Sequence, residues 1–296
     1  MKNEFEIKQL EKFARIRQHD GVVLGPCDDA AVLECFDNKN EQMVFCGDML
    51  IEDVHFIKNN TTPYQIGHKA VARTLSDIAA MGAVPSYLGF SLALPLHDRN
   101  IIDGILDGAR TLLDRFSCSL VGGDLSASDR ICCDTWCIGR VKRDLFIRRS
   151  TASAGECIFV SGNLGGSYRS GRHLDFIPKI QQAGFLVANY SIGAMIDISD
   201  GFVFDLYRVL RQSRVGAVIY ADSVPVNSDS VLHGALYDGE DYELLFTAPA
   251  ALRTSLEENG FFFVGDIIEG EPEVVLDEKG SRRSLEVDGF SSLSKG

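Results

Sequence analysis

Apolar residues recur with helical spacing most clearly between residues 62 and 85. Thr62, with Gln65 three positions later, matches the capping-box pattern at a helix start, and Gly82 is placed to end the helix in a left-handed turn. One face of this predicted helix is formed by Ile66, Ala70, Thr74, Asp77 and Met81, and it is apolar except at Asp77. The sequence therefore predicts a closely packed helix with a carboxylate on its buried side.

Asp77 is the exception on that face, and burial of an unpaired charge costs free energy. A structural ion pair, for example with Arg73, is the commoner explanation of such a residue. A bound cation is the alternative, and the helix alone does not decide between them.

The remaining pattern predicts a mixed α/β fold. Charged amphipathic spacing predicts a helix over residues 1–17, residues 20–32 have the features of a loop, and residues 98–116 have helical spacing. Strands are predicted at residues 42–50, 86–96, 119–123, 131–142, 217–221, 243–248 and 261–268. A helix is predicted to end near residue 188, and residues 194–213 to form a strand that breaks into a helix. A change of character near Arg148 predicts two domains, residues 1–147 and 148–296.

Composition narrows the function. The chain has 296 residues, 45% hydrophobic and 24% charged, with a formal net charge of −13. Such an acidic chain is a poor partner for nucleic acid, and a phosphate substrate would need divalent cations to bridge it to carboxylates. No apolar run reaches the length of a membrane span, and the start is no signal peptide, so we expect a cytoplasmic protein.

Eight cysteines are present without a C-x-x-C pair. Buried free thiols are a better explanation than zinc ligands, although Cys132, Cys133 and Cys137 lie close enough in sequence to leave the question open.

Acidic residues gather at the junctions between predicted elements. The common phosphate-binding motifs G-x-x-x-x-G-K-[ST] and G-x-G-x-x-G are absent. Asp48, Asp124 and Asp200 are each predicted to follow an apolar strand, so we expect their carboxylates to meet at one sheet edge. Converging carboxylates repel one another unless cations neutralise them, which favours Mg²⁺ holding phosphate oxygens. Gly122 and Gly123 would let backbone N–H groups approach a phosphate, or form a plain tight turn.

Several motifs in series resemble the thiamine-monophosphate kinase family. They are GPCDDAAVL, GDMLIEDVHF, HKAVARTLSDIAAMGAVP, VGGDLSAS, RRSTASAGE, IDISDGFVFDL and GEDYELLF. Their order and spacing agree over about nine-tenths of the chain. The resemblance implies a two-domain aminoimidazole-ribotide-synthetase-like fold, with an N-terminal α/β domain, a C-terminal α+β domain and a homodimer. It also implies direct in-line transfer of phosphate from ATP to thiamine monophosphate, with several Mg²⁺ ions.

The resemblance assigns roles residue by residue. It implies metal ligands at Asp29, Asp48, Asp77, Asp124, Asp197 and Asp200. It implies ATP contacts at Gly123, Asp124, Arg149 and Ser199. It implies contacts with thiamine monophosphate at His55, Glu240 and Phe290. No covalent nucleophile is expected, because phosphoryl transfer needs mainly positioning and charge neutralisation.

The chain departs from the family pattern at several places. Cys27, Cys46 and Gly47 replace the usual glycine and hydroxyl residues, Asp238 adds a negative charge beside Glu240, and the segment between Gly166 and Asp197 is short. Two alternatives therefore stay open: another ATP-dependent enzyme of the same superfamily, or a nucleotide-binding protein without catalytic activity.

Overall fold

The computed structural model describes residues 20–25, 28–35 and 38–288. The predicted first helix, Cys27 and the predicted substrate contact Phe290 lie outside these residues. Among the described helices, none is long and apolar enough to cross a membrane.

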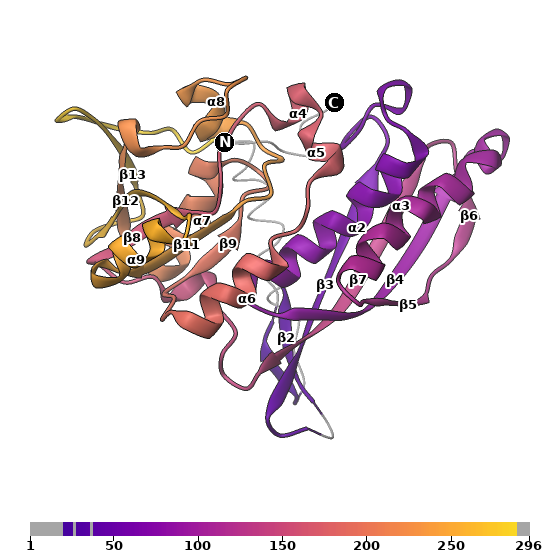
Figure 1. The fold of residues 1–296 in the computed structure, drawn as a ribbon, viewed down its shortest axis with the longest axis horizontal. Coiled ribbons are helices and arrows are strands. Elements are labelled where there is room, and N and C mark those ends of the chain that lie inside the picture. Colours follow the sequence, from indigo (N-terminus) through magenta and orange to yellow (C-terminus); the bar gives the residue numbers. More distant parts are fainter. Residues whose placement is uncertain (1–19, 26–27, 36–37, 289–296) are drawn as a thin grey trace.

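Two seven-stranded sheets organise the chain (Figure 1). The first has the order β1-β2-β3-β7-β4-β5, with β6 also paired to β4. Its strands are β1 (Val22–Leu24), β2 (Ala31–Glu34), β3 (Glu41–Ile51), β4 (Val84–Leu94), β5 (Ser119–Gly122), β6 (Leu125–Ala127) and β7 (Cys132–Lys142). The long strands β3 and β4 both run antiparallel to β7, while β5 and β6 run parallel to β4.

Two helices, α2 (Pro63–Ala80) and α3 (Ile102–Arg115), pack against each other and cover one face of the first sheet (Figure 1). The predicted capping box is present: Thr62 Oγ1 accepts a hydrogen bond from the N–H of Gln65 at 3.2 Å, and Gln65 Oε1 accepts one from the N–H of Thr62 at 3.1 Å. Gly82 ends the helix at a φ of 68°, as predicted.

The second sheet has the order β14-β13-β10-β12-β8-β11-β9. Its strands are β8 (Glu156–Val160), β9 (Met195–Asp197), β10 (Gly216–Tyr220), β11 (Leu244–Pro249), β12 (Phe262–Ile268), β13 (Val274–Glu278) and β14 (Ser281–Ser284). The helices of this half are α4 (Ser167–Ser170), α5 (Arg172–Asp175), α6 (Ile180–Asn189), α7 (Phe202–Ser213), α8 (Leu232–Tyr237) and α9 (Arg253–Glu258). Short 3-10 turns occur at Lys58–Asn60, Leu96–Ile101, Arg149–Thr151, Ala221–Ser223 and Ala250–Leu252.

The core is continuous between the halves. One hydrophobic cluster joins Leu75 and Ile78 of α2 to Ala183 of α6 and to Phe159 and Phe246 of the second sheet. A second cluster lies between α7 and the second sheet. Helix α2 thus packs against elements from both halves of the chain, which puts its polar residues next to loops of the second sheet.

Most long strands and helices match the sequence prediction within three residues. The mixed α/β class is confirmed. The predicted loop over residues 20–32 was wrong in part, because β1 and the start of β2 lie there. The placement of Asp48 at a strand end was also wrong, since β3 continues to Ile51. The proposed division at residues 147 and 148 falls between β7 and β8 and stays a prediction.

Candidate active site

Three carboxylates from distant parts of the chain converge beside α2. Asp29 lies in the loop before β2, Asp77 on α2 and Asp197 at the end of β9. One carboxylate oxygen from each lies within 4.8 Å of the others. All three were predicted as metal ligands, and they are the one such group of His, Cys, Asp and Glu ligands found in the described part of the chain.

The electrostatics of this cluster leave negative charge uncompensated. Burial raises the pKa of Asp77 well above its usual range, and the charges of Asp48, Asp197 and Asp29 raise it further. Burial, followed by the charge of Asp29, does the same to the pKa of Asp197, although the hydroxyl of Ser76 donates to that carboxylate at 2.6 Å. A site built of close, buried carboxylate oxygens has the donor chemistry that Mg²⁺ prefers.

Arg149 supplies part of the missing positive charge. Its guanidinium donates two hydrogen bonds to Asp29, from Nε at 2.9 Å and from Nη2 at 2.6 Å. The backbone N–H of the same residue donates to Asp28 at 3.2 Å. The predicted ATP contact and a predicted metal ligand therefore form one bidentate ion pair at the edge of the cluster.

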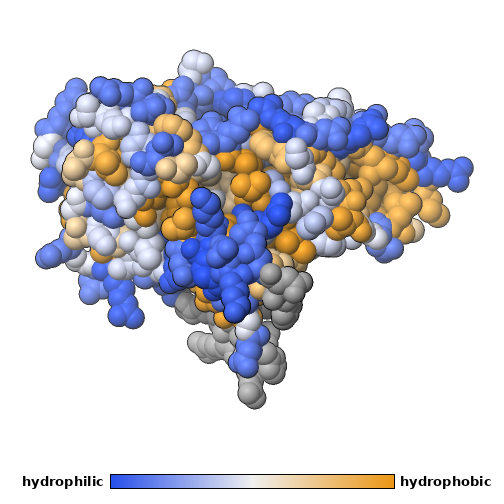
Figure 2. All heavy atoms as spheres, turned by 60° about the horizontal axis from the view of Figure 1, so that its bottom comes forward, coloured by the Kyte–Doolittle hydropathy of each residue, from blue (hydrophilic) through white to orange (hydrophobic). Residues whose placement is uncertain are grey.

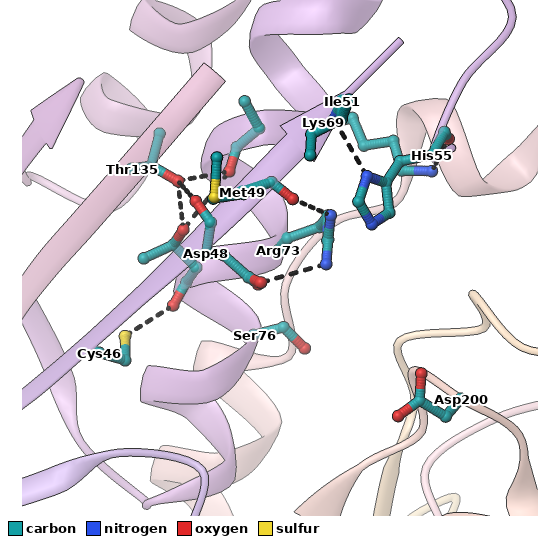
Figure 3. Close-up of polar contacts among 12 residues, drawn as sticks. Cys46, Asp48, Met49, Ile51, His55, Lys69, Arg73, Ser76, Thr135 and Asp200 are labelled. Atoms are coloured by element: carbon teal, nitrogen blue, oxygen red, sulfur yellow. Dashed lines mark hydrogen bonds and ion pairs between the residues drawn. The ribbon is translucent and has the colours of Figure 1, made fainter. Parts of the chain in front are cut away.

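Asp48 lies beside the cluster on β3, paired with Arg73 of α2 (Figure 3). Arg73 Nη2 donates to Asp48 Oδ1 at 3.1 Å, and Arg73 Nη1 donates to the carbonyl oxygen of Met49 at 2.7 Å. Burial raises the pKa of Asp48, as do the charges of Glu240 and Asp200, whereas Arg73 lowers it. The sequence-based suggestion that Arg73 pairs with Asp77 was wrong, because the Arg73 guanidinium pairs with Asp48 of β3 instead.

The loop carrying Ser199 and Asp200 is held by a residue that the sequence analysis missed. Asp205 in the first turn of α7 is fully buried, and its Oδ2 accepts hydrogen bonds from the N–H groups of Ser199, Asp200 and Gly201 at 3.0 to 3.2 Å. Asp200 itself pairs with Arg208 at 2.8 Å. The sequence did contain a signal for this role: a carboxylate in the first turn of a predicted helix that directly follows a D-x-x-D-G turn.

Glu240 lies at the centre of a second buried cluster. Its carboxylate pairs with Lys69 of α2 and approaches His173 Nδ1 of α5 at 3.3 Å. Lys69 is fully buried and also donates to the carbonyl oxygen of His55 at 2.7 Å. Burial opposes ionisation of Glu240, but Lys69 and the hydrogen bond with His173 hold its pKa below the usual range. The two predicted substrate contacts, Glu240 and His55, are thus joined through one ammonium group.

Asp124 and Gly123 lie apart from the carboxylate cluster. Asp124 is exposed between β5 and β6, and its carboxylate accepts a hydrogen bond from Ser126 at 3.0 Å. Gly123 has a φ of 156°, and a Cβ there would lie 1.8 Å from the carbonyl oxygen of Phe90. Close packing on β4 therefore explains the need for glycine at this position.

The seven described cysteines are free thiols, and none belongs to a group of metal-ligating side chains. Cys46, Cys133 and Cys137 are buried within the first sheet and its core. They pack as small apolar residues there.

Residues 27–141 match the family described as AIR synthase related protein, N-terminal domain. A thiamine-monophosphate kinase from Rhodopirellula baltica is 35% identical over 249 residues, 78% of each chain. The fold is similar to a solved structure described as "AaThiL complexed with AMPPCP and TMP", with a TM-score of 0.83, 26% identity and coverage of 98% of this chain and 97% of that one. It is also similar to the crystal structure of thiamine-monophosphate kinase from Stenotrophomonas maltophilia K279a, with a TM-score of 0.75, 31% identity and coverage of 93% and 96%.

Proposed function

This chain belongs to the thiamine-monophosphate kinase family, and we propose that it transfers a phosphoryl group from ATP directly to the phosphate of thiamine monophosphate, giving thiamine diphosphate and ADP. The convergence of Asp29, Asp77 and Asp197 carries the proposal, because phosphoryl transfer between two anionic substrates requires concentrated positive charge and this cluster is built to hold it as Mg²⁺. The acidic net charge of −13 is consistent with this solution.

Bound Mg²⁺ would supply charge neutralisation between the phosphates and the aspartates. Asp29, Asp77 and Asp197 would hold it, and Asp48 and Asp200 are proposed as further ligands at the border of the cluster. Ser76 orients Asp197 through its hydroxyl hydrogen bond, and Asp205 fixes the backbone of Asp200. No side chain of the cluster needs to form a covalent bond with the phosphoryl group.

We propose that the two substrates approach this cluster from different sides. Arg149 and Ser199 are proposed for the ATP side, where Arg149 would exchange one of its bonds to Asp29 for a phosphate oxygen. His55 and Glu240 are proposed for the thiamine monophosphate side, together with Phe290. Lys69 keeps Glu240 ionised and holds it next to the His55 backbone.

Mass spectrometry after incubation with thiamine monophosphate, ATP and Mg²⁺ tests the proposal. We expect thiamine diphosphate and ADP in equal amounts, and no thiamine diphosphate when Mg²⁺ is removed with EDTA. Asp197→Asn should abolish most of the product, whereas Asp107→Asn, an exposed aspartate of α3, serves as the matched control. ATP hydrolysis without thiamine diphosphate would instead favour another reaction of the superfamily, and nucleotide binding without turnover a non-catalytic protein.

We also propose a homodimer formed through the open face of the first sheet. Helices α2 and α3 cover one face, whereas several large apolar residues on the strands of this sheet stay about half exposed: Phe45, Met49, Tyr87 and Val121. Figure 2 shows apolar atoms gathered over the half of the molecule formed by this sheet. An apolar surface of this kind favours burial against a second copy.

Light scattering coupled to gel filtration tests the dimer. We expect a dimer for the wild type and a monomer for Val121→Glu, since residue 121 is 53% exposed on β5. Leu96→Glu changes an even more exposed leucine outside the sheet and should leave the dimer intact. A monomeric wild type, or a dimeric Val121→Glu variant, would contradict this arrangement.

A further inference from the structure

Three charged residues lie along one stripe of α2 at intervals of four residues: Lys69, Arg73 and Asp77. The Lys69 end contacts Glu240 and the backbone of His55. The Asp77 end belongs to the carboxylate cluster. Arg73 therefore occupies the position between the residues proposed for the substrate and those proposed for the metal.

The Arg73 guanidinium is anchored but not fully used. A guanidinium has five N–H donors, and Arg73 donates to the carbonyl oxygen of Met49 and to one oxygen of Asp48. Its Nε is buried and has no hydrogen-bond partner among the described residues. In the view of Figure 3 the guanidinium lies between the Asp48 carboxylate and the ring of His55. A buried donor of this kind costs free energy unless a ligand accepts its hydrogen bond.

Arg73 stays positively charged in this environment. A guanidinium is not deprotonated in proteins, and the Asp48 carboxylate lies 3.1 Å from its Nη2. The two bonds to β3 fix the guanidinium and leave its Nε donor without a partner among the described residues. Arginine binds phosphate through such paired donors better than lysine does.

We propose that Arg73 binds the phosphate of thiamine monophosphate, the group that accepts the transferred phosphoryl. This inference rests on the proposed function. In-line transfer requires the acceptor phosphate to lie between the organic part of the substrate and the metal-bound nucleotide phosphates. On α2 that intermediate position is the one held by Arg73, one turn from Lys69 and one turn from Asp77. Arg73 is thus a substrate-binding residue of this chain in addition to His55 and Glu240.

A different role would be simple neutralisation of Asp48. That role depends on charge alone. Arg73→Lys keeps the charge, so under this role it would keep the wild-type ratio of the affinities for thiamine monophosphate and thiamine. A phosphate contact through the planar guanidinium would lower that ratio in Arg73→Lys as well as in Arg73→Gln, so the ratio in the lysine variant separates the two roles.

Calorimetry with both ligands, in the presence of Mg²⁺ and the ATP analogue AMPPCP, tests the proposal. For Arg73→Gln we expect the affinity for thiamine monophosphate to fall about 10- to 100-fold, as for loss of a charge-assisted hydrogen bond, with thiamine binding unchanged. Arg73→Lys keeps the positive charge but loses the paired donors of the planar guanidinium, and should retain part of the preference for thiamine monophosphate over thiamine. Arg110→Gln, at an exposed arginine of α3, is the matched control.

The outcomes are distinguishable. An unchanged affinity ratio in either Arg73 variant, or an equal loss for both ligands, overturns the proposal while leaving the kinase function intact. If Arg73→Gln does not fold, as judged by circular dichroism, the ratio for Arg73→Lys decides. A wild-type protein that forms no thiamine diphosphate overturns the proposed function first, and with it the role of Arg73.

Discussion

At the scale of single residues, Asp77 bears a large electrostatic penalty. It is a carboxylate on a packed helix, and burial, together with the charges of three neighbouring aspartates, raises its pKa well above the usual range. Such a residue is retained against stability, which is typical of residues selected for binding or catalysis. A need for a negative charge at this place, rather than a need for packing, therefore explains why aspartate occupies this apolar face.

Replacing Asp77 by asparagine should separate stability from activity. Without Mg²⁺, Asp77→Asn should raise the free energy of unfolding, because asparagine removes a carboxylate that is buried and lies close to three other aspartates. Product formation should fall by at least about 100-fold, the upper cost for residues that only support metal ligands. Thermal unfolding and the mass-spectrometric assay measure the two effects.

The same variant should lose the stabilisation by metal. Mg²⁺ at 100 times its Kd should stabilise the wild type by about 2.7 kcal/mol and Asp77→Asn by much less. Asp107→Asn, which changes an exposed aspartate, should respond to Mg²⁺ as the wild type does. Equal stabilisation of all three proteins would count against a metal ion at Asp77.

Thiol reactivity gives a prediction that depends on pH. Burial raises the pKa of Cys133 to about 12 from 9.0, so at pH 8 its thiolate fraction is about 10⁻⁴ instead of about 10⁻¹. The folded protein holds this proton between pH 9 and 12 while the unfolded chain releases it, so the stability contributed here falls as pH rises through that window. Iodoacetamide at pH 8, followed by peptide mass spectrometry, should label half-buried Cys35 long before Cys133. Faster labelling of Cys133 would show that the strand opens readily.

The resemblance of the motifs to a known family singled out Asp29, Asp77 and Asp197, which the structure brings together, but their role as metal ligands stays a prediction. The pairs Arg73–Asp48 and Lys69–Glu240 were not predicted. Local patterns carry no information on partners 25 or 171 positions apart in sequence. Such pairs follow from strand register and from the packing of α2 against the second half.

At the scale of elements, two glycines set the distance between α2 and α3. A Cβ at Gly67 would lie 1.8 Å from the carbonyl oxygen of Ile105, and one at Gly108 would lie 1.9 Å from that of Tyr64. These contacts are with backbone, which cannot move aside without shifting a helix. The close approach in turn fixes the position of α2 relative to α3, and α2 carries Asp77 and Arg73.

Gly108→Ala should therefore destabilise the fold although alanine has the higher helix propensity. We expect a loss of about 1–3 kcal/mol in the free energy of unfolding, the usual cost of overpacking. Gly184→Ala is the matched control, because this exposed glycine of α6 has no atoms near its Cβ position and should gain about 1 kcal/mol. Urea unfolding measures both variants. A stabilised Gly108→Ala variant would mean that the helices separate without cost.

Elements could be predicted from the sequence where the spacing of apolar residues and the capping residues agreed, as for α2. It missed short elements such as β1, β6 and β14, whose three or four residues carry too little pattern. Edge strands of this kind form because a neighbouring strand offers hydrogen bonds. The position of these strands is therefore determined by the rest of the sheet and not by the sequence of the short segment itself.

At the scale of the whole molecule, one buried ammonium ties the two halves together. Lys69 on α2 contacts Glu240 before β11, His173 on α5 and the backbone of His55. Glu240 and Tyr242 both adopt positive φ values, 69° and 50°, which are unfavourable for residues other than glycine. The ion pair with Lys69 compensates for the strain of that loop and keeps it beside the site.

A double-mutant cycle on Lys69 and Glu240 tests this coupling. Lys69→Met should lower the free energy of unfolding by about 3–5 kcal/mol, because it leaves a buried carboxylate without its partner. Glu240→Leu should cost a similar amount by leaving the ammonium uncompensated. The double variant should be more stable than either single variant, since burial of a neutral pair removes the desolvation cost of both charges. Arg110→Met, at an exposed ion pair, should cost less than about 1 kcal/mol. Additive losses in the double variant would show that Lys69 and Glu240 act independently, and that the halves are held together by apolar packing of α2 alone.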